Sequence, residues 1–291
     1  MPRIRSGQAA WITFVSIGLH LAYQALRSPP ERVAEFRRMR LNRRTKALGV
    51  AALCIGAIAL PAAPASAGTK AMGIDVSRFQ GAIAWPTVAT AQIKFAFVQA
   101  SRGSGSDCAV KPNQCGADPF FAANRVGAES NGIRVGAYHR AFASGGTAAT
   151  ARADAIAEAD VFLTAVGSLQ TGELVPVLDV ETPFSGMTAR TLRTWIRVWV
   201  KKVNRRLGRK PMIYTNASSW AATGNTLEFA KAKYPLWVAE WGVSRPSVPA
   251  RNWGGHGYSV WQYSSSGTVP GISGNVDQDR LGKGLAKITV H

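Results

Sequence analysis

Short apolar runs alternate with amphipathic or loop-like segments from residue 72 almost to the end of the chain. Each run is rich in β-branched and aromatic residues and ends in a polar or aromatic residue, which is typical of a buried strand. Two longer segments have the residue spacing of helices instead. The predicted strands are residues 72–76, 95–99, 135–139, 174–180, 212–215, 236–239 and 259–263, with a short last strand near Val276.

The two predicted helices lie between strands in the middle of the chain. Residues 147–166 are rich in alanine with scattered acids, and residues 188–207 place Trp195 and Trp199 on an apolar face opposite arginines and lysines. Strands that alternate with helices are typical of a mainly parallel sheet. Some connections, particularly after Tyr214, are too short for a full helix. We therefore expect a single-domain α/β fold, an irregular TIM-like (β/α) barrel of about eight strands.

The first quarter of the chain has the pattern of an export signal. A basic stretch over 40–46 is followed by an almost wholly apolar stretch over 47–60, and a small-residue site ends at Ala67. The apolar core, about 14 residues long, is too short to remain as a membrane-spanning helix. The sequence predicts a secretory signal over 39–67, cleavage after Ala67, a secreted or wall-associated protein, and a barrel domain over 68–291.

Residues 1–38 precede a signal that is already complete. We interpret them as an extension from a misassigned start, because Met39 stands just before the basic stretch. A second interpretation is a membrane anchor over 11–23, which is short and contains His20.

Lysine and arginine outnumber the acids and give the chain a net charge of +19. Removing residues 1–67, with ten Lys/Arg and two Asp/Glu, leaves +11. A basic exported protein is attracted to anionic surfaces such as a bacterial wall with phosphate polymers. Arginine-rich, solvated helix faces explain the charge equally well. No nucleic-acid-binding motif accompanies it, so we expect no nucleic-acid partner.

Two cysteines remain after the signal, and they enclose a short loop. Cys108 and Cys115 predict a disulfide, because export carries the chain into an oxidising compartment. A metal site would need further ligands nearby, and the sequence has none there.

Two carboxylates end the apolar run over 174–180. Asp179 and Glu181 are two residues apart, so on a strand they share one face, roughly 6–7 Å apart. Crowded acids repel, and one of them then keeps its proton near neutral pH. Such a pair suits glycoside hydrolysis. The alternative is a strand end whose acids cap a helix or bind an arginine.

The other predicted strands also end in polar or aromatic residues. In barrels of this type the active site lies at the carboxyl ends of the strands. We therefore expect the acids among these residues to surround one cleft. His139 is open to two interpretations, a core residue or a base, and Glu240 is either a cleft acid or an ion-pair partner. The strand-end residues are Asp75, Ser101 with Arg102, Tyr138 with His139, Asp179 with Glu181, Tyr214 with Asn216, Glu240 with Trp241, Gln262 and Asp277.

Several short motifs occur in a familiar order over about residues 72–281. Together they resemble the family 25 glycoside hydrolases, the Chalaropsis-type lysozymes or N-acetylmuramidases. The motifs are Gly73-Ile74-Asp75-Val76-Ser77, Gly136-Ala137-Tyr138-His139, Pro176-Val177-Leu178-Asp179-Val180-Glu181, Ile213-Tyr214-Thr215, Leu236-Trp237-Val238-Ala239, Trp261-Gln262-Tyr263, Gly271-Ile272 and Val276-Asp277.

The resemblance implies hydrolysis of the β-1,4 bond between N-acetylmuramic acid and N-acetylglucosamine in peptidoglycan, with net retention and without a metal or other cofactor. Glu181 would be the general acid. Asp179 would stabilise positive charge on an oxocarbenium-like centre or an oxazolinium, and Asp75 and Asp277 would orient the pair. The expected substrate contacts are Tyr138, Tyr214, Trp241, Gln262 and Arg102. We expect peptidoglycan strands and anionic wall polymers as partners, and a monomer.

One strand end departs from the family pattern. A Lys-x-Thr-Glu-Gly-like sequence is usual there, whereas this chain has Gln99-Ala100-Ser101-Arg102-Gly103. The departure keeps open a catalytically degenerate, wall-binding barrel, against which the four retained acids argue. A chitinase-like hexosaminidase is the other alternative. It would carry a further Asp where this chain has Val177, which argues against it.

Overall fold

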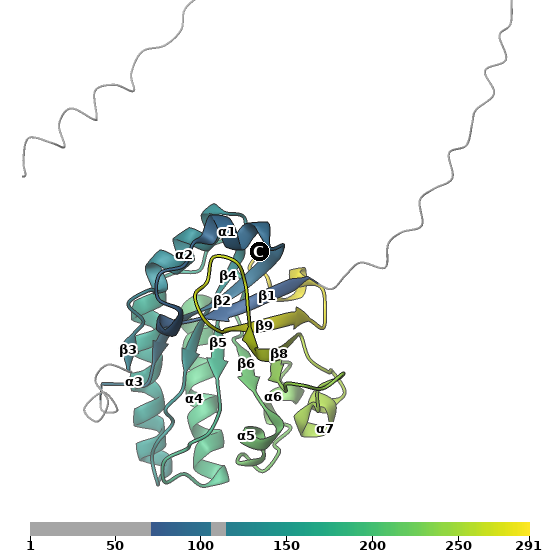
Figure 1. Ribbon diagram of the computed structural model, residues 1–291. Coiled ribbons are helices and arrows are strands. Elements are labelled where there is room, and N and C mark those ends of the chain that lie inside the picture. Colours follow the sequence, from purple (N-terminus) through teal and green to yellow (C-terminus); the bar gives the residue numbers. More distant parts are fainter. Residues whose placement is uncertain (1–70, 106–114) are drawn as a thin grey trace, which may run out of the picture. The chain divides into compact units, whose positions relative to one another are not determined.

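The computed structural model describes residues 71–105 and 115–291 (Figure 1). They belong to the compact unit Ala63–His291. The expected extension over 1–38, the signal over 39–67 and Cys108 lie outside the described residues. The signal, its cleavage site and the Cys108–Cys115 disulfide therefore stay predictions.

The described residues form a closed mixed barrel with helices packed around it. Its strands are β1 (Met72–Val76), β2 (Ile93–Arg102), β4 (Arg134–Arg140), β5 (Val177–Asp179), β6 (Met212–Thr215), β7 (Leu236–Ala239), β8 (Val260–Gly267) and β9 (Val276–Leu281). The order around the ring is β1-β9-β8-β7-β6-β5-β4-β2, and β1 pairs with β2 to close it. A short strand, β3 (Gly116–Ala117), is added to the end of β2. The expected irregular eight-strand barrel is confirmed.

One strand of the ring runs against the others. β9 is antiparallel to both of its neighbours, β1 and β8, whereas the remaining pairs of the ring are parallel. The prediction that Asp277 ends a strand is therefore wrong, because Asp277 is the second residue of β9. It reaches the same end of the barrel because the strand runs the opposite way.

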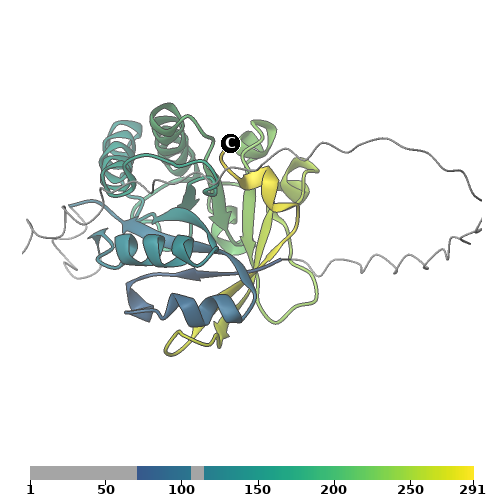
Figure 2. The ribbon, with the colours of Figure 1, turned by 90° about the horizontal axis from the view of Figure 1, so that it is seen from above.

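Two long helices, α3 (Ala148–Val166) and α4 (Ala189–Leu207), lie side by side in both views (Figures 1 and 2). Both begin where the sequence predicts, because the Thr147 and Thr188 hydroxyls accept hydrogen bonds from backbone N–H groups of the first turn. Trp195 and Trp199 on α4 are buried, as expected for the face that packs on the barrel. The remaining helices are η1 (Arg78–Gln80), α1 (Trp85–Thr90), α2 (Phe121–Ser130), α5 (Ala217–Ala221), α6 (Glu228–Lys231), α7 (Pro249–Gly254) and η4 (Leu285–Ile288).

The helices after β6 are short, as the connection after Tyr214 predicts. Within the described part of the chain, no helix combines the length and apolar character needed to cross a membrane.

Alternate residues of each strand build two apolar layers, one inside the ring and one between the ring and the helices. The inner layer is largely aromatic. The Phe97 and Trp237 rings stack at 4.4 Å between centroids. Tyr138 and Tyr214 meet the Trp237 indole edge-on at 6.5 and 4.7 Å. These rings pack against one another inside the barrel.

Two glycines make room for the inner rings. A Cβ atom at Gly73 would lie 2.3 Å from the Phe95 ring, and one at Gly136 would lie 2.6 Å from Phe97. Both distances are too short for any side chain, so the packing of the two phenylalanines depends on glycine in β1 and β4.

Gly73→Ala should lower the free energy of unfolding by about 2 kcal/mol, because the added methyl group forces Phe95 or a strand to move. Urea unfolding followed by tryptophan fluorescence measures the change. Gly284→Ala is the control, since nothing lies within 4 Å of a Cβ there and its φ of −60° suits alanine. Equal stabilities of the two variants would contradict the close packing around Gly73.

Candidate active site

A cleft of about 340 Å³ opens at the end of the barrel where the parallel strands terminate. Residues from every strand of the ring line it, so the expectation that the strand ends meet around one cleft is correct. Eight of the nine predicted catalytic and substrate-binding residues lie in its wall. The lining consists of Asp75, Val76, Ser77, Phe79, Gln80, Gln99, Arg102, Tyr138, Arg140, Asp179, Glu181, Tyr214, Trp237, Gln262 and Asp277.

Asp179 and Glu181 both face this cleft, as their spacing predicts. The hydrogen-bonded strand ends at Asp179, but the alternation continues, since Leu178 and Val180 are buried in the outer apolar layer. Hydrogen bonds hold the backbone on either side of Glu181. The Thr215 hydroxyl donates to the Val180 carbonyl at 2.8 Å.

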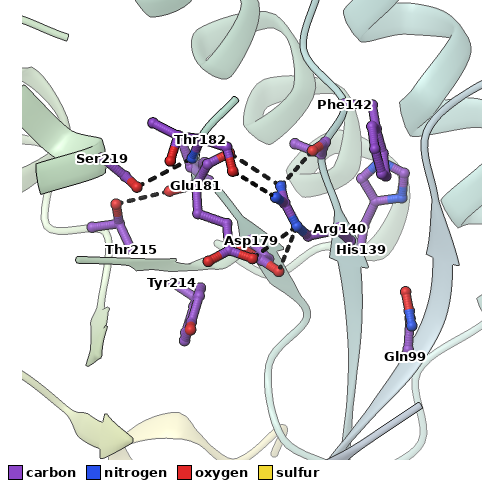
Figure 3. Close-up of polar contacts among 12 residues, drawn as sticks. Gln99, His139, Arg140, Phe142, Asp179, Glu181, Thr182, Tyr214, Thr215 and Ser219 are labelled. Atoms are coloured by element: carbon purple, nitrogen blue, oxygen red, sulfur yellow. Dashed lines mark hydrogen bonds and ion pairs between the residues drawn. The ribbon is translucent and has the colours of Figure 1, made fainter. Parts of the chain in front are cut away.

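On the other side of Glu181, the N–H of Thr182 donates to the Ser219 hydroxyl at 3.2 Å (Figure 3). Both anchoring hydroxyls come from β6 and α5. The chain segment that carries Glu181 is therefore attached to the next strand and helix of the ring, although it lies beyond the strand ladder.

Arg140 joins the two acids. Its Nε lies 2.9 Å from Glu181 Oε1 and 3.6 Å from Asp179 Oδ2 (Figure 3). Its Nη1 also donates to the carbonyls of Ala141 at 2.6 Å and Glu181 at 3.2 Å, and its Nη2 donates to the Thr182 carbonyl at 3.1 Å. These contacts fix the guanidinium and hold both carboxyl groups beside it.

Arg140 was not among the predicted site residues, although the sequence pattern contains a signal for it. Arg140 follows Tyr138 by two residues on β4, so both face the barrel interior. Its importance becomes visible only when β4 is paired beside β5, where Arg140 lies opposite Asp179 in the strand register.

Burial raises the pKa of Asp179 well above its usual range, and the Glu181 charge raises it further, while Arg140 and Arg102 oppose the shift. The Asp179 carboxyl is almost fully buried, and its Oδ1 has no hydrogen-bond partner among the described residues. A proton on Asp179 relieves both the desolvation and the repulsion. This agrees with the expectation that one acid of the crowded pair keeps its proton.

Asp75 and Asp277 lie directly opposite each other on β1 and β9. The side-chain amide of Gln262 donates to Asp75 Oδ2 at 2.8 Å and to Asp277 Oδ2 at 3.4 Å. Its oxygen accepts from the Tyr214 hydroxyl and from the Trp241 indole, both at 3.0 Å. Because an indole N–H only donates, the Gln262 oxygen must face Trp241, and its NH₂ must face the acids.

The acids around Gln262 also bind protons more tightly than exposed acids do. Burial raises the pKa of Asp75 well above its usual range, with further contributions from the charges of Asp279 and Asp277. Burial likewise raises the pKa of Asp277 to about 6, a hydrogen bond with Asp75 opposes the shift, and the Glu181 charge adds to it.

Asp279 is a fifth acid in this group, which the sequence analysis did not place in the site. It is fully buried, accepts a hydrogen bond from the Trp237 indole at 2.9 Å, and has a raised pKa, chiefly because of burial. Trp237, in the middle of β7, was also missed, and it lines the cleft. Asp279 thus fixes the orientation of a ring in the cleft wall.

The predicted aromatic contacts differ in position. Tyr138 and Tyr214 line the cleft and are nearly buried, whereas Trp241 is 53% exposed and reaches the site through Gln262. Trp261, from the motif on β8, is buried in the outer layer, where its indole donates to the Glu240 carbonyl at 2.8 Å. Trp241 is therefore the more accessible of the two tryptophans.

His139 belongs to the core and not to the cleft. Its ring lies between the Ser101 hydroxyl and the Glu158 carboxyl, each at 2.8 Å, and stacks on Trp199. Burial, and secondarily the charge of Arg140, lowers its pKa to about 3. Although serine, histidine and glutamate are adjacent here, all three side chains are fully buried, so no substrate reaches them.

Two other strand-end residues make local hydrogen bonds to the backbone that follows them. The Glu240 carboxylate accepts hydrogen bonds from the backbone N–H and hydroxyl of Ser247, and among the described residues it neither lines the cleft nor forms an ion pair. The Asn216 side chain caps α5, accepting from the Ser219 N–H at 2.8 Å.

A β-bulge decides which residues at the end of β2 face the cleft. Gln99 pairs with Tyr138, but the next pair joins Ser101 to His139, so Ala100 is an extra residue. Beyond the bulge the alternation is shifted by one, which turns Ser101 outward and Arg102 into the cleft.

Among the described residues, no group of three or more His, Cys, Asp or Glu side chains is arranged to hold a metal ion.

Comparison with known proteins agrees with the geometry. The family model described as glycosyl hydrolases family 25 matches residues 74–272. Lysozyme M1 of Streptomyces globisporus is 36% identical over 225 residues, which cover 74% of this chain and 69% of that protein. The N,O-diacetylmuramidase of Arthroderma benhamiae is 30% identical over 251 residues, which cover 81% of this chain and 97% of that protein.

A solved structure has the same barrel. The bacterial lysozyme from Streptomyces coelicolor superposes with a TM-score of 0.64 at 35% identity, over 76% of this chain and 95% of that chain. The resemblance noted in the motifs is therefore confirmed over most of the barrel. The chain belongs to the glycosyl hydrolases of family 25.

Proposed function

We propose that this chain is a secreted lysozyme that hydrolyses the β-1,4 bond between N-acetylmuramic acid and N-acetylglucosamine in peptidoglycan. The observation that carries the proposal is the pair of acids, Asp179 and Glu181, held side by side in the cleft by Arg140. Family membership supports a peptidoglycan-hydrolysing glycosidase, and the cleft contains both carboxyl groups that such chemistry needs.

Glu181 is the general acid of the proposed mechanism. Its side chain is 32% exposed, against 9% for Asp179, so it is the more accessible of the two. Glu181 gives its proton to the glycosidic oxygen as the bond between that oxygen and the anomeric carbon breaks. The acetamido oxygen of the substrate then bonds to the anomeric carbon and forms an oxazolinium. Asp179 stabilises its positive charge as a carboxylate, so the proton of the pair, which burial favours on Asp179 in the free enzyme, passes to Glu181 when the substrate binds.

In the second half of the reaction, the Glu181 carboxylate takes a proton from water as the water oxygen attacks the anomeric carbon. The carbon–oxygen bond of the oxazolinium ring breaks, the acetamido group is restored, and two inversions give net retention. Arg140 stabilises the Glu181 carboxylate during the interval in which its proton is on the leaving sugar.

The remaining acids adjust the charge of the cleft. Burial favours the protonated forms of Asp75 and Asp277, and it raises the pKa of Asp277 to about 6. In this state they place less negative charge beside Asp179 and Glu181. Gln262 keeps them oriented through its two N–H groups.

We also propose that anionic wall polymers bind the basic surface and that the enzyme acts as a monomer. A groove beside α3 and α4 has the strongest concentration of positive side chains among the described pockets. Two of its members pair with acids, Lys202 with Asp160 and Arg197 with Glu228, which leaves the others available for phosphate groups. Its lining is Arg152, Ile156, Arg197, Val198, Lys201, Lys202 and Arg205.

Glu181→Gln should reduce the release of reducing ends from purified peptidoglycan by roughly 10²–10⁴-fold, because glutamine cannot donate the required proton. Glu240→Gln is the matched control, since Glu240 binds Ser247 and does not line the cleft. Mass spectrometry of the products identifies the cleaved bond. N-acetylglucosamine instead of N-acetylmuramic acid at the new reducing end would contradict the proposed specificity.

Export should remove the first 67 residues, because the small-residue site ends at Ala67. Amino-terminal sequencing of protein recovered from the culture medium should start at Gly68. Ala65→Arg together with Ala67→Arg should leave the precursor uncleaved, and a precursor processed as before would refute this site.

Stability should fall as pH rises from about 4 to about 7, and Asp277→Asn should flatten this dependence. The pKa of Asp277, raised to about 6 from 3.8, means that the folded chain binds the proton more tightly than the unfolded chain. Its stabilising contribution is complete below about pH 3.8 and disappears as pH rises through about 6. Urea unfolding at several pH values measures the slope.

Gln80→Asn is the control for this experiment, because it changes a residue of the same cleft without removing a titrating group. Asp75, Asp179 and Asp279 contribute slopes of the same sign, since their pKa values are also raised by burial. A wild-type stability that rises between pH 4 and pH 7 would show that these acids are not buried as described.

A further inference from the structure

Arg102 occupies a position in the cleft that ordinary strand alternation would not give it. The bulge at Ala100 turns it inward, while Ser101 is turned outward to His139. The guanidinium then lies between two aromatic rings, 4.9 Å from the centre of Phe142 and 5.8 Å from the centre of Phe79. Cation–π contacts of this kind hold the side chain in place.

The two rings differ in exposure. Phe79 is 71% exposed, although it lines the cleft, and Phe142 also contacts Arg140, whose guanidinium lies 5.4 Å from the ring centre. From the exposed rim to the acid pair, the side chains therefore follow in the order Phe79, Arg102, Phe142 and Arg140. An extended substrate that reaches Glu181 from this side would pass Arg102.

Arg102 also differs from the other arginine beside the acids. Arg140 is paired with Asp179 and Glu181, whereas the guanidinium of Arg102 has no ion pair or hydrogen bond within the described residues. Its Nε is buried and has no hydrogen-bond partner in the part of the chain that the structure describes. A buried N–H group that has lost water and gained no acceptor is costly.

The surroundings make that positive charge still less favourable. Burial lowers the pKa of Arg102, and the charges of Arg140 and Arg78 lower it further, while Tyr138 and Asp179 oppose the shift in part. A bound anion would supply the hydrogen-bond acceptor that Arg102 Nε lacks. It would also compensate the positive charge of the guanidinium. A carboxylate has the planar, two-oxygen geometry that matches the guanidinium fork, whereas a sugar hydroxyl brings no charge.

We propose that Arg102 binds a carboxylate carried by the muramic acid residue of the substrate, and that it makes the cleft selective for this acidic sugar over neutral N-acetylglucosamine polymers. The inference rests on the proposed muramidase function. The carboxylate has two sources. It is the free acid of the lactyl arm in peptide-free glycans, or it belongs to the stem peptide joined to that arm in intact peptidoglycan.

The test compares three purified glycans of equal length. The first is peptide-free with free lactyl carboxylates, the second is the same glycan converted to methyl esters, and the third carries stem peptides. The quantity measured is the ratio of kcat/KM for each carboxylate-bearing glycan to kcat/KM for the ester. Binding of the same glycans is measured by calorimetry.

For Arg102→Gln, we expect the ratio to fall roughly tenfold or more relative to wild type, because a charge-assisted contact is lost. Arg102→Lys should recover part of it, since it keeps the charge without the planar fork. Lys94→Gln, at the opposite end of β2, is the control and should leave the ratio unchanged. A fall confined to the peptide-free glycan identifies the lactyl carboxylate, and a fall confined to the peptide-bearing glycan identifies the stem peptide.

A ratio that is the same in wild type and Arg102→Gln would overturn the proposal, as would equal binding of acid and ester by the wild type. Failure of the proposed function looks different. In that case the wild type releases no reducing ends from any of the three glycans, and the calorimetric comparison of acid and ester still tests Arg102.

Discussion

Mutual repulsion among carboxyl groups is the constraint around which the end of this barrel is built. Asp75, Asp179, Glu181, Asp277 and Asp279 come from strands or strand ends that converge there, and burial is the chief cause of the raised pKa values of the four aspartates. Three devices compensate the repulsion. Arg140 forms ion pairs with Asp179 and Glu181, and the Gln262 amide donates hydrogen bonds to Asp75 and Asp277. In addition, the buried acids bind protons.

The barrel supplies the geometry that these devices need. Aromatic rings fill the interior below the acids, and glycines at 73 and 136 admit those rings. Packed side chains therefore form the floor of the cleft. The Trp237 indole, which donates a hydrogen bond to Asp279, is one of them. Backbone carbonyls beyond β4 and β5 hold Arg140, so the cation between the acids is fixed by main chain as well as by charge.

Much of this arrangement follows from local pattern. Short apolar runs place β1, β6 and β7 at their observed bounds, and threonine caps set the starts of α3 and α4. Asp75, Asp179, Glu181 and Asp277 were predicted to share a cleft, and they do, although their roles stay predictions. The features that were missed depend on pairing between distant segments. The direction of β9, the bulge at Ala100 and the position of Arg140 opposite Asp179 exist only once neighbouring strands are aligned.

The cleft can form only after β8, β9 and β1 have paired. Gln262 and Asp75 bond across 187 residues of chain, and β9 must lie between β8 and β1 before the acids can meet. Contacts so distant in sequence form late, because loop closure must precede them. Because β9 closes the ring between β8 and β1, the cleft is complete only when nearly all of the barrel has folded. A fragment that stops before β9 would keep Asp179 and Glu181 but lack Asp277, and its barrel would stay open.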